Sequence, residues 1–141
     1  MSQQPVVADV ALDVTLECLD ESGHHHQIDT VLGYHRPDPY AVTMTFLTAN
    51  EPLVWTFGRD LLIRGMHEPS GDGDVHVSPA INEAGRAVVV VTLSSPDGSL
   101  LLEARTDQIA EFLDRSLALV PSGTESPNLD LDEMIAQLLS A

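Results

Sequence analysis

The apolar residues near the start of the chain recur at every second position. Each even-numbered residue from Val6 to Cys18 is apolar, whereas the odd positions include Asp13 and Glu17. A period of two is typical of a β-strand with one buried face, because successive side chains point to opposite sides of a sheet. The chain is therefore expected to begin with a long, half-buried strand.

Further short segments with strand-like composition follow at close spacing. They cover residues 27–35, 40–47 and 53–57, and then residues from 75 onward, 88–93 and 100–104. A proline-glycine turn at residues 94–98 joins the last two into a hairpin. The run Gly71-Asp72-Gly73-Asp74 is predicted to be a turn shaped by its two glycines. This spacing indicates an antiparallel meander of about seven strands.

Two segments break the alternation. Residues 59–66 are predicted to form a short helix closed by Gly65, although a continued strand is an alternative. Thr106 is a plausible N-cap for a second helix to about Leu119, which Pro121 ends. The predicted fold class is α+β, with helices packed on one side of an antiparallel sheet.

The chain of 141 residues is long enough for one domain with its own core. We predict a single α+β domain over residues 1–120 and a linker over residues 121–129. Residues 130–141 are predicted to form a short amphipathic helix with a capping box at Asp130 and Glu133. Such a helix is marginal alone, so it should dock on its own domain or on a neighbouring subunit.

The charge balance limits the partners. The formal net charge is −16, with six arginines and no lysine. Nucleic-acid binding requires basic residues that neutralise phosphates, so this class is disfavoured, as are anionic membrane surfaces. A protein partner, or a self-assembly interface with acidic residues at its rim, is easier to reconcile with this charge.

Several other classes receive no support. The apolar runs are too short to insert into a membrane and no signal peptide is recognised, so cytoplasmic residence is expected. The single Cys18 cannot form an internal disulfide. Without lysine there is no Schiff-base chemistry and no P-loop. No catalytic motif is found, and no cofactor is expected.

Two clusters invite a metal-site interpretation. In His24-His25-His26 only His24 and His26 could converge if the segment is extended, and a solvated turn is the favoured interpretation. Asp72 and Asp74 lack the spacing of a calcium loop. No metal site is predicted.

Trp55, Phe57 and Arg59 form the sharpest constellation. Trp55 and Phe57 share one face of a strand and are either an exposed binding hot spot or, preferably, core residues. Arg59 beside Asp60 is either part of an internal ion pair or an interface residue. Arg59 and Asp60 are thus the candidates for contact with a protein partner.

Nearly the whole chain from Tyr34 onward resembles one known family, the SsgA-like proteins of sporulating actinobacteria. The first strand matches in pattern only, and the histidine run is not associated with the family. The matching elements, in order, are Tyr34, Asp38-Pro39-Tyr40-Ala41-Val42, Phe46, Val54-Trp55, Phe57, Arg59-Asp60-Leu61-Leu62, Gly65, Pro69, Gly71, Gly73-Asp74-Val75, Leu93-Ser94-Ser95-Pro96, Gly98, Leu101-Leu102-Glu103-Ala104, Phe112-Leu113, Arg115, Val120-Pro121, Gly123-Thr124-Glu125 and Asp130-Leu131-Asp132.

The resemblance implies a non-enzymatic regulator of sporulation-specific cell division. Such proteins mark septum sites, help to bring the tubulin-like FtsZ to them and influence septal peptidoglycan remodelling. The chain looks most like the member that contacts FtsZ directly. The resemblance also implies a fold like that of the Whirly single-stranded nucleic-acid-binding proteins and homo-oligomers such as trimers. The nucleic-acid function of Whirly proteins is the alternative, which the absence of lysine disfavours.

Overall fold

A computed structural model describes residues 8–20, 22–126, 135 and 138–140. Its strands form one antiparallel sheet in the order β4-β3-β2-β1-β8-β7-β6-β5. The fold class predicted from the sequence is confirmed. The strands are β1 (Val10–Leu19), β2 (His25–Tyr34), β3 (Ala41–Phe46), β4 (Leu53–Gly58), β5 (Ser70–Asp72), β6 (Val75–Ile81), β7 (Ala87–Ser95) and β8 (Gly98–Arg105), and the helices are α1 (Arg59–Gly65) and α2 (Thr106–Leu119).

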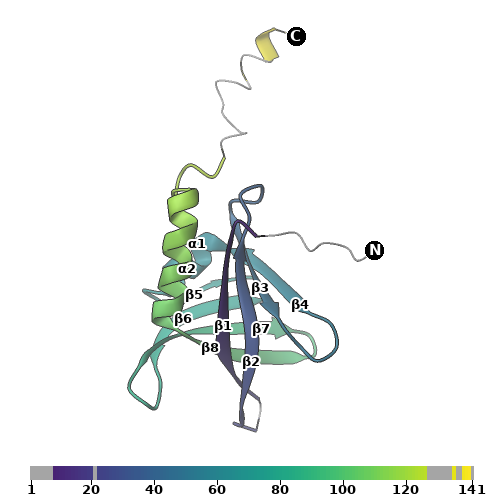
Figure 1. The fold of residues 1–141 in the computed structure, drawn as a ribbon, viewed down its shortest axis with the longest axis vertical. Helices are drawn as coiled ribbons and strands as arrows, with labels where there is room; N and C mark the ends of the chain where they lie inside the picture. The colour runs from purple at the N-terminus through teal and green to yellow at the C-terminus, as the bar shows by residue number, and fades with distance from the viewer. Residues whose placement is uncertain (1–7, 21, 127–134, 136–137, 141) are drawn as a thin grey trace.

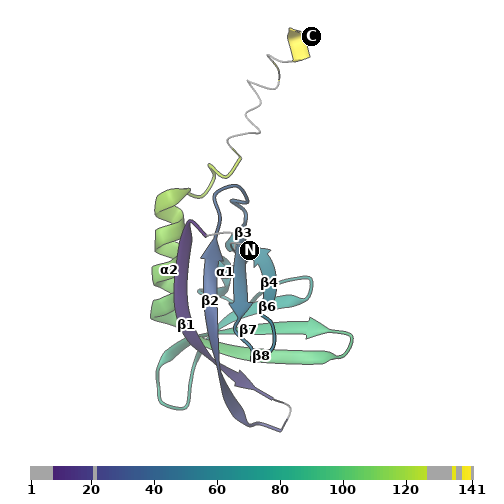
Figure 2. The same ribbon diagram turned by 45° about the vertical axis from the view of Figure 1, so that its right-hand side comes forward.

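The sheet is sharply curled. Strands β1 to β4 run across β6 to β8 instead of continuing beside them (Figures 1 and 2). The two halves join where β1 meets β8, and the pairing there covers only Glu17–Leu19 opposite Leu101–Glu103. By contrast, β1 pairs with β2 along its whole length. The short junction lets the two halves fold toward each other around a shared core.

The alternation seen in the sequence places the core. Val14, Leu16 and Cys18 of β1 are buried, as the period of two predicted. They join buried residues from every other strand except β5, which is too short to contribute, and from both helices. In α2 the buried residues are Ile109, Phe112, Leu113 and Ser116, and this face packs on β1, β7 and β8.

The prediction that two glycines shape a turn at residues 71–74 is correct for Gly73 and wrong for Gly71. Ser70–Asp72 forms the edge strand β5, which pairs with Val75–Val77, so the sheet has eight strands and not seven. Gly73 does shape the turn, with φ at +61°. Gly71 instead lies in β5, where a Cβ would come within 2.5 Å of the His76 ring. Three residues are too few to show a period of two, which is why the sequence pattern missed this strand.

The short helix α1 is confirmed, but its glycine has another role. Met66, not Gly65, occupies the C-cap position. Gly65 is buried, and a Cβ on it would lie 2.2 Å from Cγ1 of Val77. Glycine therefore lets α1 approach β6 closely.

Helix α2 begins one residue earlier than its predicted cap implied. Arg105 occupies the N-cap position and Thr106 is the first helical residue, because β8 runs into the helix with no loop between them. The helix ends at Leu119, with Pro121 shortly beyond, as predicted.

Only parts of the C-terminal segment lie among the described residues. Residues 127–134 of the predicted linker and tail helix lie outside them. Ile135, Leu138 and Leu139 are helical, and their exposed fractions are 50%, 70% and 82%. Within the described part of the chain, no helix is both long and apolar enough to cross a membrane.

Candidate functional site

Arg59 is the most deeply buried charged side chain among the described residues. It is the first residue of α1 and is 1% exposed. Its guanidinium donates to the main-chain oxygen of Ser116 in α2 at 3.1 Å and to Oε2 of Glu125 at 3.2 Å. It also lies over the Tyr34 ring, with Cζ 4.8 Å from the ring centre. We call Arg59, Tyr34, Ser116 and Glu125 the Arg59 cluster.

The cluster decides between the two interpretations of Arg59. A buried cation must be paired, and a guanidinium has donors for several acceptors at once. Arg59 is an internal ion-pair residue whose partner is Glu125, 66 positions away. Of the two interpretations, the structure favours the internal ion pair, because the Arg59 side chain is buried and paired.

Glu125 ties the segment after α2 to the domain. Its Oε1 accepts a hydrogen bond from the main-chain N–H of Gly123 at 2.6 Å, and its side chain is 15% exposed. Burial raises the pKa of Glu125, but hydrogen bonds from its own N–H, from that of Gly123 and from Arg59 outweigh this, so the pKa lies below its ordinary value. The first residues of the predicted linker are thus part of the folded domain.

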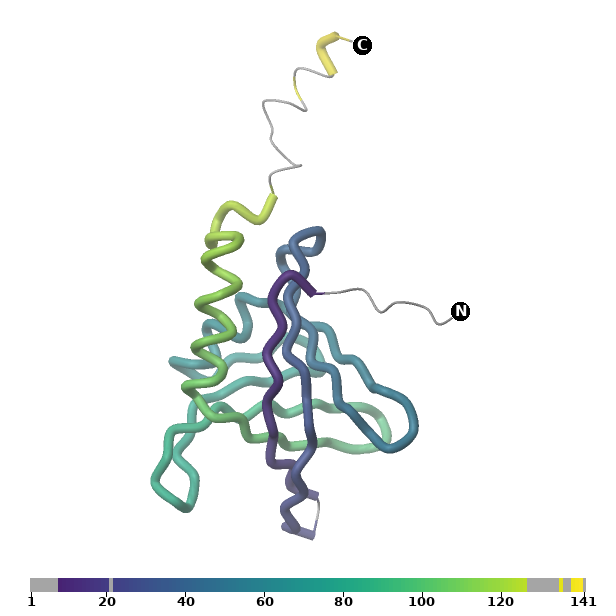
Figure 3. The backbone as a smooth tube through the Cα atoms, viewed as in Figure 1, coloured from purple at the N-terminus to yellow at the C-terminus, as the bar shows by residue number. Residues whose placement is uncertain are grey.

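Tyr34 connects the cluster to the segment between β2 and β3. Its hydroxyl donates to the main-chain oxygen of Pro39 at 2.8 Å. Burial raises the pKa of Tyr34, and the charge of Arg59 opposes this only in part. The β2–β3 connection and the end of α2 lie at the same end of the molecule (Figure 3). The cluster therefore fixes both of these segments.

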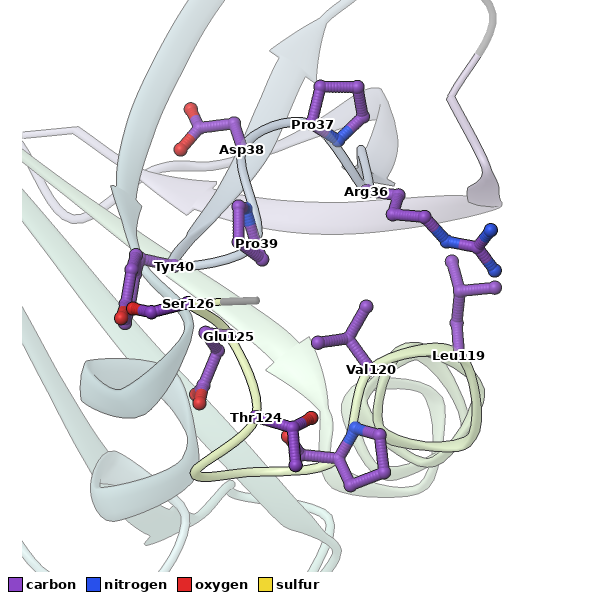
Figure 4. Close-up of a pocket in the computed structure, with 11 residues that line it drawn as sticks. Arg36, Pro37, Asp38, Pro39, Tyr40, Leu119, Val120, Thr124, Glu125 and Ser126 are labelled. Carbon is purple, nitrogen blue, oxygen red and sulfur yellow. The ribbon is translucent and has the colours of Figure 1, made fainter. Parts of the chain in front are cut away.

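A pocket of about 470 Å³ lies between these two segments. One wall is residues 36–40, and the other is Leu119, Val120, Pro121 and residues 124–126. Arg36 and Leu119 stand on one side of the opening, and Tyr40 and Ser126 on the other (Figure 4). The lining is largely apolar, as in most ligand pockets, but it includes no His, Cys or Lys. It offers an apolar anchor site.

Asp60, Trp55 and Phe57 are not part of the lining of this pocket. Asp60 is on the surface, with its side chain 81% exposed and an Oδ2 atom 3.0 Å from Nε of Arg64 one helical turn later. Phe57 is buried in the core, whereas Trp55 is partly buried and faces the β7–β8 hairpin across a shallow recess. Although Asp60 and Arg59 are adjacent in sequence, their side chains have different ion-pair partners, Arg64 for Asp60 and Glu125 for Arg59.

Two residues of the histidine run, His24 and His26, lie beside the Asp20 carboxylate. Nε2 of His26 lies 3.0 Å and Nδ1 of His24 lies 3.7 Å from Asp20, while His25 faces Glu17. The hydrogen bonds from His26 and from the main-chain N–H of His24 lower the pKa of Asp20. Among the described side chains, no group of three or more His, Cys, Asp or Glu is arranged to hold a metal ion.

Sequence reasoning missed the pairing of Arg59 with Glu125 and the pocket beside it. No periodicity links two residues so far apart in the chain. The only signal was that Tyr34, Arg59 and Glu125 all lie among the residues that carry the family resemblance.

The chain is similar to one family over most of its length. The profile described as "Streptomyces sporulation and cell division protein, SsgA" matches residues 28–125. The sporulation-specific cell division protein SsgB of Streptomyces coelicolor is 42% identical over 132 residues, which cover 93% of this chain and 96% of that protein. The SsgB protein of Kineococcus radiotolerans is 43% identical and covers 94% of this chain and 81% of its own length.

Solved structures extend the similarity to the fold. An SsgA-like sporulation-specific cell division protein from Thermobifida fusca superimposes with a TM-score of 0.79 at 33% identity, covering 91% of this chain and 93% of that one. A structure reported with SsgB mutations that correlate with longitudinal cell division during sporulation of Streptomyces coelicolor gives a TM-score of 0.77 at 43% identity. It covers 82% of this chain and 91% of that one.

Proposed function

Because this chain belongs to the SsgA-like family of sporulation and cell-division proteins, we propose that it is a non-enzymatic adaptor that positions FtsZ at septum sites. In this role it acts in the cytoplasm at the septum. The observation that carries the proposal is the continuous similarity to SsgB proteins over more than nine-tenths of the chain.

The match to the family profile covers the Arg59 cluster completely. It runs from Ile28 in β2 to Glu125, so it includes Tyr34, Arg59 and Ser116 as well. The profile thus ends at the residue that closes the buried ion pair. This agreement supports the view that the folded unit needed by the family extends to Glu125, beyond α2.

The chemistry of the described surface supports binding over catalysis. The largely apolar pocket beside the Arg59 cluster can hold an anchor side chain, and no hydroxyl of its described lining is hydrogen-bonded to a carboxylate. Exposed apolar residues outside the pocket include Leu53, Val54 and Ile81, at 55%, 58% and 75%. Such residues are suited to contact with protein partners, including other copies of the chain. A homo-oligomer, with a trimer as the first expectation, is part of the proposal.

Co-sedimentation with FtsZ polymers tests the adaptor function. Purified chain is mixed with FtsZ and GTP, the polymers are pelleted, and the amount of chain in the pellet is compared with that in a sample without GTP. We expect GTP-dependent enrichment in the pellet. The adaptor function fails if no enrichment occurs at any salt concentration from low to physiological.

A further inference from the structure

Strand β4 is an open edge of the sheet. It pairs with β3 on one side and is the first strand in the sheet order, so no strand of the described residues lies on its other side (Figures 1 and 2). None of its six residues is charged. Leu53 and Val54 are 55% and 58% exposed, and Thr56 is also exposed.

The register shows which main-chain groups of β4 face outward. The N–H of Arg59 donates to the oxygen of Tyr40. Hydrogen-bonded and non-hydrogen-bonded pairs alternate along an antiparallel ladder. With Val42 opposite Phe57 and Met44 opposite Trp55, the main-chain groups of Phe57 and Trp55 face β3. Those of Val54 and Thr56 therefore point away from the sheet.

The two edges of the sheet differ in how they are protected. Natural proteins usually blunt an edge with charges, proline, a bulge or a very short strand, because unpaired main-chain groups attract another strand. The opposite edge, β5, has only three residues and carries Asp72. Strand β4 has twice that length and none of these features within its bounds. Its outward face is thus suited to accept a strand.

We propose that β4 binds an extended segment of a partner protein, which adds to the sheet as a further strand next to Val54 and Thr56. This is recognition by β-strand addition, in which main-chain hydrogen bonds supply much of the affinity. The segment is neutral along its length and basic at its ends. The biological identity of the partner rests on the proposed adaptor function, whereas the strand-binding property of β4 does not.

The charges around β4 favour a basic segment over a second copy of this chain. Glu51 lies just before the strand and, in the described part of the chain, its carboxylate has no ion-pair partner. Asp60 lies just after it and is 81% exposed. Antiparallel pairing of two β4 strands would bring Glu51 of each copy near Asp60 of the other, between chains that each carry a net charge of −16.

A synthetic peptide tests the proposal without any knowledge of the partner. The probe is a short peptide of alternating threonine and valine with an arginine at each end, labelled for fluorescence anisotropy. Thr56→Pro removes an outward N–H and places a ring in the path of the incoming strand, but it leaves the ladder with β3 intact. Thr56→Val is the matched control, because it alters the same side chain and keeps the N–H.

We expect the wild-type chain and Thr56→Val to bind the peptide equally, and Thr56→Pro to bind it at least about tenfold more weakly. A peptide with glutamates at its ends should not bind. Circular dichroism verifies that Thr56→Pro is folded. If it is not, Val54→Lys, which adds a positive charge at the same edge, provides the same test with the same expected loss.

Three outcomes would overturn the proposal. They are equal binding by wild type and Thr56→Pro, no binding of the arginine-ended peptide at about millimolar concentration, and self-association of the wild type that Thr56→Pro abolishes. The last would assign the edge to a second copy. Failure here is distinct from failure of the adaptor function, because FtsZ co-sedimentation of the wild-type chain is measured separately and requires no particular surface.

Discussion

The Arg59 side chain carries a buried charge that holds α1 to the segment after α2. It is 1% exposed and joins α1 to the end of α2 and to Glu125. Replacing a whole buried ion pair with apolar residues is often neutral, but removal of one partner leaves the other uncompensated. The cluster is therefore sensitive to single substitutions.

We expect Arg59→Ala to lower the free energy of unfolding by about 3–5 kcal/mol, because it leaves a cavity and an unpaired carboxylate. Urea titration followed by Trp55 fluorescence measures this. Arg64→Ala is the control, since it breaks only the exposed pair with Asp60 and should cost about 0.5 kcal/mol or less. Equal costs for the two variants would contradict the structure around Arg59.

The lowered pKa of Glu125 predicts how its contribution depends on pH. A carboxylate whose folded pKa lies below its unfolded value stabilises the protein above the unfolded value. This contribution is lost as the pH falls through the folded pKa. The ordinary value is 4.5. The contribution should therefore be constant near neutral pH and should decline below pH 4.5.

Comparison of the wild type with Glu125→Gln isolates this effect from the other carboxylates. We expect the difference in unfolding free energy between the two proteins to be constant from about pH 6 to pH 8. It should shrink as the pH falls below the ordinary pKa of glutamate. A difference that grows on acidification would show that the pKa of Glu125 is raised instead.

Residue-level roles were the hardest to predict from the sequence. The burial of Phe57 could be predicted from its place in an alternating strand. The ion pair between Arg59 and Glu125 could not, because Asp60 was the nearer acidic candidate and the true partner is brought in only when α2 packs on the sheet. Local sequence does not encode such a pairing.

At the scale of elements, α1 depends on a close approach to β6. Gly65 is the last helical residue of α1, and within a helix alanine is ordinarily more stable than glycine by roughly 1 kcal/mol. Here a Cβ would lie 2.2 Å from Cγ1 and 2.4 Å from Cβ of Val77, so the two elements cannot keep their spacing. Overpacking of this kind destabilises.

We expect Gly65→Ala to lower the free energy of unfolding by about 1–3 kcal/mol, in the direction opposite to helix propensity. Val77→Ala in the same chain should recover part of this cost, because it removes the methyl groups that clash. Thermal unfolding of the two single variants and the double variant gives the coupling between them. Strict additivity would mean that α1 and β6 are not in contact.

The elements that could be predicted were those long enough to show a period. The ten residues of β1 and the fourteen of α2 each repeat their pattern several times. Strand β5 has three residues and was read as part of a turn. The curl of the sheet was also beyond prediction, because it depends on where β1 leaves β8 and not on any local pattern.

At the scale of the whole molecule, charge argues against nucleic-acid binding, which was the alternative function raised by the family resemblance. With a net charge of −16 and no lysine, the chain has little to neutralise phosphates. We expect no binding of a single-stranded oligonucleotide in fluorescence anisotropy even at low salt. Tight binding that weakens steeply with added salt would refute the argument from charge.

The absence of lysine also makes one measurement unusually direct. Carbodiimide couples carboxylates to amines, and this chain offers many carboxylates but no lysine amine. Zero-length coupling in a mixture with FtsZ polymers therefore joins carboxylates of this chain to lysines of FtsZ, and side chains of two copies of the chain are not joined to each other. Mass spectrometry of the coupled peptides then locates the contact.

The adaptor account predicts products that join this chain to FtsZ, with coupling concentrated at Glu51 and Asp60 on either side of β4. A chain that forms no product with FtsZ polymers, under conditions in which a known FtsZ-binding protein does, would contradict the claim that it contacts FtsZ directly.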